Sequence, residues 1–319
     1  MWERLNAFCC FIFLSFFSHQ QPVIAFTLIT FDVDGTLVSG SGKKADASAH
    51  SRAFGYAIEM VLGDGNPAQA KVVGDVLPKE LYHGSTDGLI LLRLARATLG
   101  IEPNISRPRL DEMMNIMYGY INDMQDTEIA CGINPLPGVI DTLSTLANHK
   151  ESVSCGLVTG NVEGIARRKM KAVGILDTKA LSDPCPDQLK RNWQGTNHLG
   201  FLGGFGSDYC SGNIDDDDRN YLDRAEQIAI AVRRCQNVTG QELRRVIHVG
   251  DAPADVLAAK SYSKIAGKDI CVGLIGLSTG SYSSEQLKEL AGESFPGRWE
   301  PIILDGMDDP AFLRACGID

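Results

Sequence analysis

Carboxylates follow two segments whose composition is typical of buried β-strands. Asp32 and Asp34 come after one such β-branched, apolar run, and Asp251 comes after another much later in the chain. Because clustered carboxylates concentrate negative charge, a cation must neutralise them, and an oxygen-only set with few ligands suits Mg²⁺. Mg²⁺ retains water molecules and shares its coordination sphere with phosphate groups. The pattern therefore predicts magnesium-assisted chemistry on a phosphorylated ligand.

The segments around these acids alternate between strand and helix patterns. Strands are predicted over 26–31, 152–158, 245–249, 270–275 and 301–304, and helices over 139–147, 166–173, 222–235 and 284–291. Such alternation is typical of a parallel sheet with helices on both faces, in which ligands bind at the carboxyl ends of the strands. Since Asp32, Thr159 and Asp251 all lie at such ends, we expect them to share one site.

Residues 41–134 depart from this alternation and carry mainly helical patterns. Apolar side chains recur at helical spacing at Leu89, Leu92, Ala95 and Leu99, and again at Met113, Met117, Tyr120 and Met124. We interpret these stripes as packing faces and the whole segment as a mostly α-helical insertion.

Three short motifs resemble those of the haloacid dehalogenase superfamily. Phe31–Val38 (Phe-Asp-Val-Asp-Gly-Thr-Leu-Val) resembles its first motif, Leu157–Asn161 its second and Gly250–Asp255 its fourth, in the family's order. The resemblance covers nearly everything after residue 26. It implies an α/β fold with a Rossmann-like, three-layer parallel-sheet core, formed by 26–40 and 135–319. Residues 41–134 would then be the helical cap of the phosphoglycolate-phosphatase-like branch.

The resemblance also assigns roles to the acids. Asp32 is expected to attack phosphorus as the nucleophile and form an aspartyl-phosphate. Asp34 is expected to protonate the leaving alkoxide and then to deprotonate the hydrolytic water. The metal site is expected at Asp32, Asp34, Asp251 and Asp255, with Asp255 either coordinating Mg²⁺ or orienting its ligands. Thr36 is expected to hold the loop by hydrogen bonding.

Substrate contacts are expected from two further segments. Thr159, Gly160 and Asn161, at the start of a helix, would grip the phosphoryl oxygens. His83-Gly84-Ser85-Thr86-Asp87 resembles the substrate loop of the same branch. Within this loop, Ser85 or Thr86 either binds substrate or only caps the helix that follows.

The third motif of the family departs from its usual form, because no Lys-Pro pair occurs in the chain. A cation is still required to offset the carboxylates and the phosphate. Our first choice is Arg219, at the start of a predicted helix; Lys169, Arg168 and Lys190 are the alternatives.

Together these features predict an enzyme, a phosphoric monoester hydrolase that uses Mg²⁺ and an aspartyl-phosphate. Phosphoglycolate and sugar phosphates are the leading substrate classes. In the dehalogenase branch the residue two after the nucleophile is not an acid, so Asp34 favours phosphoryl transfer. A phosphomutase of the same fold stays open, as does a non-catalytic binding protein, although the intact acids oppose the latter.

The N-terminus resembles a leader. Ala7–Phe17 is uncharged and too short to span a bilayer, and Val23-Ile24-Ala25 matches a signal-peptidase site. We expect residues 1–25 to be a cleaved signal peptide, leaving no stable membrane association; the alternatives are an uncleaved membrane anchor and a mis-assigned start codon. The destination is either the secretory route or a plastid, or the cytoplasm if the leader does not function.

Composition limits the partners. The 319 residues carry a net charge of −10, which disfavours nucleic-acid binding. The scattered cysteines form no disulfide framework or zinc motif. His248, in the middle of a predicted strand, is expected to be a core histidine. For Asp215–Asp218, a solvated loop is favoured over a calcium site. Oligomeric state is not encoded in any pattern that we find.

Overall fold

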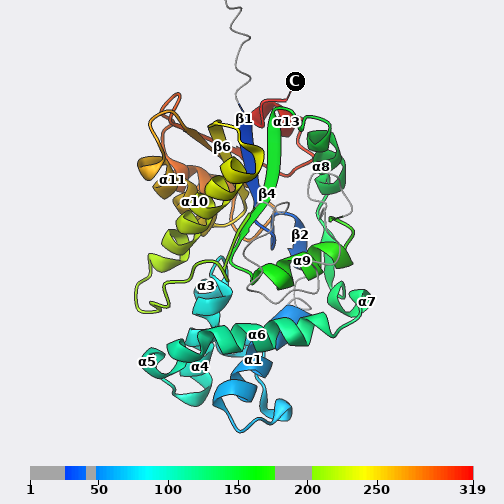
Figure 1. Ribbon diagram of the computed structural model, residues 1–319, viewed down its shortest axis with the longest axis vertical. Helices are drawn as coiled ribbons and strands as arrows, with labels where there is room; N and C mark the ends of the chain where they lie inside the picture. The colour runs from blue at the N-terminus through cyan, green and yellow to red at the C-terminus, as the bar shows by residue number, and fades with distance from the viewer. Residues whose placement is uncertain (1–25, 41–47, 177–202, 319) are drawn as a thin grey trace, which may run out of the picture.

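The computed structural model describes residues 26–40, 48–176 and 203–318 (Figure 1). Within them, six strands form one parallel sheet in the order β5-β4-β1-β6-β7-β8. The strands are β1 (Phe26–Phe31), β4 (Val153–Thr159), β5 (Gly203–Phe205), β6 (Leu243–Gly250), β7 (Cys271–Leu277) and β8 (Trp299–Leu304). This sheet confirms the predicted Rossmann-like α/β core.

Helices cover both faces of the sheet, and the strand sequences reflect this. Every residue of β1 is buried, as expected for a strand with no solvent-facing side. Leu28 packs with the helices on one face, whereas Ile29 and Phe31 pack with those on the other. The first group is α10 (Arg219–Thr239), α11 (Pro253–Ile265) and α12 (Ser284–Ala291); the second is α8 (Val139–Ala147), α9 (Glu163–Ala172) and α13 (Phe312–Ala315).

The order of the strands explains how distant residues meet. β1 lies between β4 and β6, with Phe31 in register with both Leu157 and Val249. All three strands run in the same direction, so the residues that follow them emerge at one edge of the sheet. Asp32, Thr159 and Asp251 are thereby brought to neighbouring positions.

A separate group of helices lies beyond this edge, at the lower end of Figure 1. It contains α1 (Ala49–Leu62), η2 (Pro67–Gln69), α2 (Val73–Val76), α3 (Lys79–Tyr82), α4 (Asp87–Leu99), α5 (Pro103–Ser106), η3 (Arg107–Arg109), α6 (Leu110–Asn122) and α7 (Asp126–Ile129). These helices share an apolar core of their own, which also takes in Val162 and Ile165 next to and within α9. Most residues of the predicted stripes lie in this core: Leu89, Leu92 and Met113 are completely buried, whereas Leu99, at the end of α4, is 38% exposed.

The chain enters and leaves this helical group through a two-stranded antiparallel ribbon. β2 (Val38–Gly40) pairs with β3 (Ile133–Pro135), so the two connections lie side by side. No helix among the described residues combines the length and hydropathy needed to cross a membrane. The predicted leader and Lys190 lie outside the described residues.

Several bounds match the sequence-based predictions, and others do not. β1, α8 and α12 have the predicted limits, whereas α10 begins three residues earlier and ends four later than expected. The helix α11 and the short strand β5 were not predicted. β5 consists of Gly-Gly-Phe. Because glycine is depleted in strands, this composition does not predict one.

Glycine at 204 is required by the close packing of α10 on β5. A Cβ atom at this position would lie 2.0 Å from the backbone oxygen of Gln227 in α10, whereas a Cβ at Gly119 in α6 would meet nothing within 4 Å. We therefore expect Gly204→Ala to lower the free energy of unfolding, and Gly119→Ala to be neutral or stabilising by up to about 1 kcal/mol. Urea unfolding of both variants checks this, and equal effects would contradict the packing described.

Candidate active site

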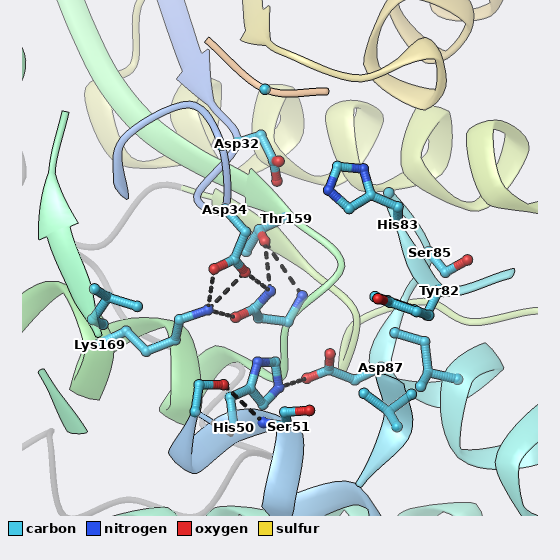
Figure 2. A pocket seen from close by; sticks show the side chains of 18 of the residues that line it. Asp32, Asp34, His50, Ser51, Tyr82, His83, Ser85, Asp87, Thr159 and Lys169 are labelled. Atoms are coloured by element: carbon cyan, nitrogen blue, oxygen red, sulfur yellow. Dashed lines mark hydrogen bonds and ion pairs between the residues drawn. The ribbon is translucent and has the colours of Figure 1, made fainter. Parts of the chain in front are cut away.

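A cavity of about 480 Å³ opens between the sheet edge and the helical group. Asp32, Asp34, Thr159 and Asp251 line its sheet side, and residues of the helical group line the other. Figure 2 shows Asp32 and Asp34 at one end of this cavity, with His50, Ser51 and Asp87 at the other. The acids that were predicted to share one site therefore do so.

The loop after β1 is fixed by contacts with the loop after β6. The backbone N–H of Asp32 donates to the carbonyl of Val249 at 2.9 Å, and Thr36 Oγ1 donates to Asp251 Oδ1 at 3.1 Å. Gly35 adopts φ = +94°, and a Cβ there would lie 2.3 Å from Asp251 Oδ2. Only glycine fits this approach. The predicted role of Thr36 in holding the loop is confirmed.

Asp32, Asp251 and Asp255 form a buried cluster of carboxylates. Each offers one oxygen, and these oxygens all lie within 4.8 Å of one another. Burial raises the pKa of Asp32 to about 7, although Arg224 opposes the rise. Burial, with Asp255 and Asp32 next in effect, raises the pKa of Asp251 well above its ordinary value. Because Asp251 Oδ2 is buried with no hydrogen-bond partner, the cluster fits a hard divalent cation.

Asp255 is held more firmly than the other two acids. Its Oδ1 accepts from Arg224 Nη1 and lies 3.1 Å from His248 Nε2, and its Oδ2 accepts from the Ala252 N–H at 3.0 Å. Against the effect of burial, Arg224 and His248 lower the pKa of this carboxyl. His248 is fully buried, as predicted, and its Nδ1 lies 3.0 Å from Thr30 Oγ1. It therefore positions an acid of the site from within the core.

The structure brings a different arginine to the acids from the one chosen by sequence. Arg224 Nη1 lies 3.3 Å from Asp32 Oδ1 and also bonds Asp255, with its side chain only 3% exposed. Arg219 instead pairs with Asp216 at 2.6 Å, one-third exposed, and does not line the cavity. Five residues along a helix correspond to a rotation of about 140°, so the two side chains leave opposite sides of α10.

A second cation, Lys169 of α9, contacts Asp34. Lys169 Nζ lies 2.5 and 2.6 Å from the two carboxylate oxygens of Asp34 and donates to Asn161 Oδ1 at 3.0 Å (Figure 2). Burial acts to raise the pKa of Asp34, but Lys169 and then His50 outweigh it and hold the pKa at about 2. Arg168, the other described alternative, pairs instead with Asp126.

The Thr159–Asn161 turn completes the sheet side of the cavity. Asn161 Nδ2 donates to Thr159 Oγ1 and to Asp34 Oδ2, both at 3.1 Å. Thr159 and Asn161 line the cavity, whereas Gly160 contributes a backbone carbonyl that accepts from the N–H of Asp87 at 2.7 Å. The turn therefore joins the acids to the helical group.

The segment before α4 lies directly against this turn. Thr86 is completely buried and caps α4, since its Oγ1 accepts from the N–H of Leu89 at 3.3 Å; it does not line the cavity. Ser85 does line it and donates to Asn220 Oδ1 at 2.8 Å. Asp87 Oδ2 accepts from the N–H of Val162 at 2.8 Å and lies 3.1 Å from His50 Nε2.

Two histidines of the site were not selected from the sequence. Figure 2 shows the ring of His83 facing Asp32, and its Nδ1 is buried with no partner among the described residues. Burial, with a smaller contribution from Lys79, lowers the pKa of His83. His50 reaches the cavity from the start of α1. The motif around His83 was visible in the sequence, but no motif marked His50.

The comparisons with known proteins agree with this architecture. A family model for haloacid dehalogenase-like hydrolases matches residues 26–262. Among solved structures, CbbY from Rhodobacter sphaeroides in complex with phosphate is 14% identical, with a TM-score of 0.44, covering 92% of this chain and 100% of that one. No curated protein gives a significant match.

Two further solved structures were found to be similar to this chain. Beta-phosphoglucomutase from Pyrococcus sp. strain ST 04 is 14% identical, with a TM-score of 0.40 and coverage of 92% of this chain and 99% of that one. L-2-haloacid dehalogenase from Xanthobacter autotrophicus is 12% identical, with a TM-score of 0.38 and coverage of 91% and 98%.

The two arginines of α10 give a direct test of the site's charge balance. Arg224→Met leaves buried carboxylates without their counter-ion, which is expected to lower the free energy of unfolding by about 3–5 kcal/mol. Arg219→Met breaks an exposed pair and is expected to cost at most about 1 kcal/mol. Urea unfolding in the presence of a chelator measures both. Similar losses for the two variants would contradict the assignment of Arg224.

Proposed function

We propose that this chain, which belongs to the haloacid dehalogenase-like hydrolase family, is a Mg²⁺-dependent phosphatase acting on a small phosphorylated metabolite. The observation that carries the proposal is the pairing of two acids with different environments in one cavity. Asp32 is 4% exposed beside Arg224, whereas the side chain of Asp34 is about half exposed and paired with Lys169. The nucleophile and the acid–base residue would then be two distinct carboxylates, with Asp32 in the buried acid cluster and Asp34 outside that cluster, in the same cavity.

In the first step, an Asp32 carboxylate oxygen attacks phosphorus and the bond from phosphorus to the leaving oxygen breaks. The product is an aspartyl-phosphate, and the leaving oxygen receives a proton from Asp34 to become an alcohol. Asp34 is an ionised carboxylate when paired with Lys169, so this transfer requires that substrate binding separate the pair and that Asp34 take up a proton first. Thr159 and Asn161, which line the cavity, would bind the phosphoryl oxygens.

In the second step, Asp34 takes a proton from water, and the resulting hydroxide attacks phosphorus. Inorganic phosphate leaves and the Asp32 carboxylate is restored. Asp32, Asp251 and Asp255 would hold Mg²⁺. When bound, the ion supplies positive charge that offsets the carboxylates and the phosphoryl oxygens.

The helical group, residues 41–134 in our division of the chain, would act as a cap over this chemistry. Its Asp87 bonds the backbone at Gly160 and Val162, and Ser85 bonds Asn220 of α10. These contacts hold the helical group against the edge of the sheet, where it forms the far side of the cavity. The β2–β3 ribbon is the connection about which such a cap would move.

Substitution of the two acids tests the proposal. With Mg²⁺ and a panel of phosphate monoesters that includes phosphoglycolate and sugar phosphates, we expect Asp32→Asn to abolish phosphate release. Asp34→Asn is expected to lower kcat by about 10²–10⁴-fold, since general acid–base catalysis is lost. Asp215→Asn, an exposed acid paired with Arg96 outside the cavity, is the matched control and is expected to retain activity.

The same assay distinguishes the alternatives. Phosphate release that is equal in wild type and Asp32→Asn would contradict the proposal. Movement of phosphate between positions of a sugar phosphate, without free phosphate, would instead identify a phosphomutase.

A further inference from the structure

Part of the cavity side formed by the helical group is apolar. Six apolar side chains line it, and each is less than a tenth exposed: Phe54, Val73, Ile90, Ile121, Ile129 and Ile133. They come from α1, α2, α4, α6, α7 and β3, and we call these six residues the apolar wall. A volume of about 480 Å³ is in the range of pockets that enclose drug-sized ligands, which leaves room for a leaving group beyond the phosphate.

The lysine and arginine side chains that line the cavity already bond to other residues. Among the described lining residues, Arg224 bonds Asp32 and Asp255, and Lys169 bonds Asp34. Lys79 is exposed and donates to Ser281 Oγ in the loop after β7, at the seam with the core. Each lysine and arginine among the described lining residues therefore already has a polar partner.

Polar groups of the helical group line the same cavity as the apolar wall. Ser51 and His50 line the cavity, and the buried carboxylate of Asp87 lies beside His50. Hydroxyl and imidazole groups bind an alcohol or ether oxygen, whereas the Asp87 carboxylate repels an anion. A carboxylate placed here without a counter-ion would lose its hydration with no compensating partner.

From this wall we infer the substrate class, an inference that rests on the proposed phosphatase activity. We propose that the leaving group is an uncharged alcohol with an apolar body. A hydroxy acid such as glycolate, or a group bearing a second phosphate, would meet apolar side chains and the Asp87 carboxylate. The structure thus favours amphiphilic phosphate monoesters over phosphoglycolate.

A homologous series of esters tests this on the full chain with Mg²⁺. We expect kcat/KM to rise from methyl to butyl to hexyl phosphate, by up to about fourfold for each methylene that the wall buries. Phosphoglycolate is expected to be at least tenfold poorer than ethyl phosphate, which has a similar size but no carboxylate.

Two isoleucines provide matched variants. Ile121→Ala removes part of the wall and is expected to lower the ratio of hexyl to methyl phosphate kcat/KM by at least threefold. Ile140→Ala removes the same atoms from an exposed position on α8, outside the cavity, and is expected to leave the ratio unchanged. Because the readout is a ratio between substrates, a partial loss of folded protein does not change it. Phe54→Leu is a milder second variant of the wall.

The outcomes separate this inference from the proposed function. A flat or falling series, or a preference for phosphoglycolate, would overturn the inference while phosphate release still supported a phosphatase. Equal ratios in Ile121→Ala and Ile140→Ala would also overturn it. No release from any ester would remove the phosphatase proposal, and this inference with it.

Discussion

The burial of three carboxylates at one edge of the sheet is the constraint on which the rest of the structure depends. Asp32, Asp251 and Asp255 are at most 4% exposed, and charges so withdrawn from water persist only when counter-ions or hydrogen bonds compensate them. Arg224 supplies one positive charge to two of these acids. Asp251 Oδ2 has no hydrogen-bond partner, so the charge of this buried carboxylate is not fully compensated. A divalent cation bound here would supply the missing compensation.

The sheet core and the helical group meet at the edge of the sheet that carries the acids. The core supplies the strand ends and Arg224, whereas the helical group supplies Asp87, which bonds the turn that carries Asn161. Lys169, on a helix that packs against both parts, holds Asp34 through its two oxygens. The proposed catalytic site and the apolar wall therefore both depend on the contacts between the core and the helical group, and neither part forms the cavity alone.

The sequence was sufficient for five of the six strands of the sheet and for the acids, because these leave local patterns. Strongly apolar strands followed by aspartates placed Asp32 and Asp251 correctly, and the periodicity of α8 and α12 gave their limits. The sequence was not sufficient to identify Arg224 as the cation beside Asp32, since the spacing of residues alone does not say which side of α10 meets the sheet. Nor could it show that Thr86 caps a helix away from the cavity, because substrate loops and helix caps use the same residue types.

The response of thermal stability to Mg²⁺ tests the central claim most directly. If the buried carboxylates hold the ion, the Tm of wild type rises with Mg²⁺ concentration, as binding at one site of the folded state requires. At a Mg²⁺ concentration of 100 times Kd, the free energy of unfolding increases by about 2.7 kcal/mol. Potassium at matched ionic strength has no such effect, and Asp251→Asn loses the response. A wild type and an Asp251→Asn variant that respond to Mg²⁺ alike would contradict the account.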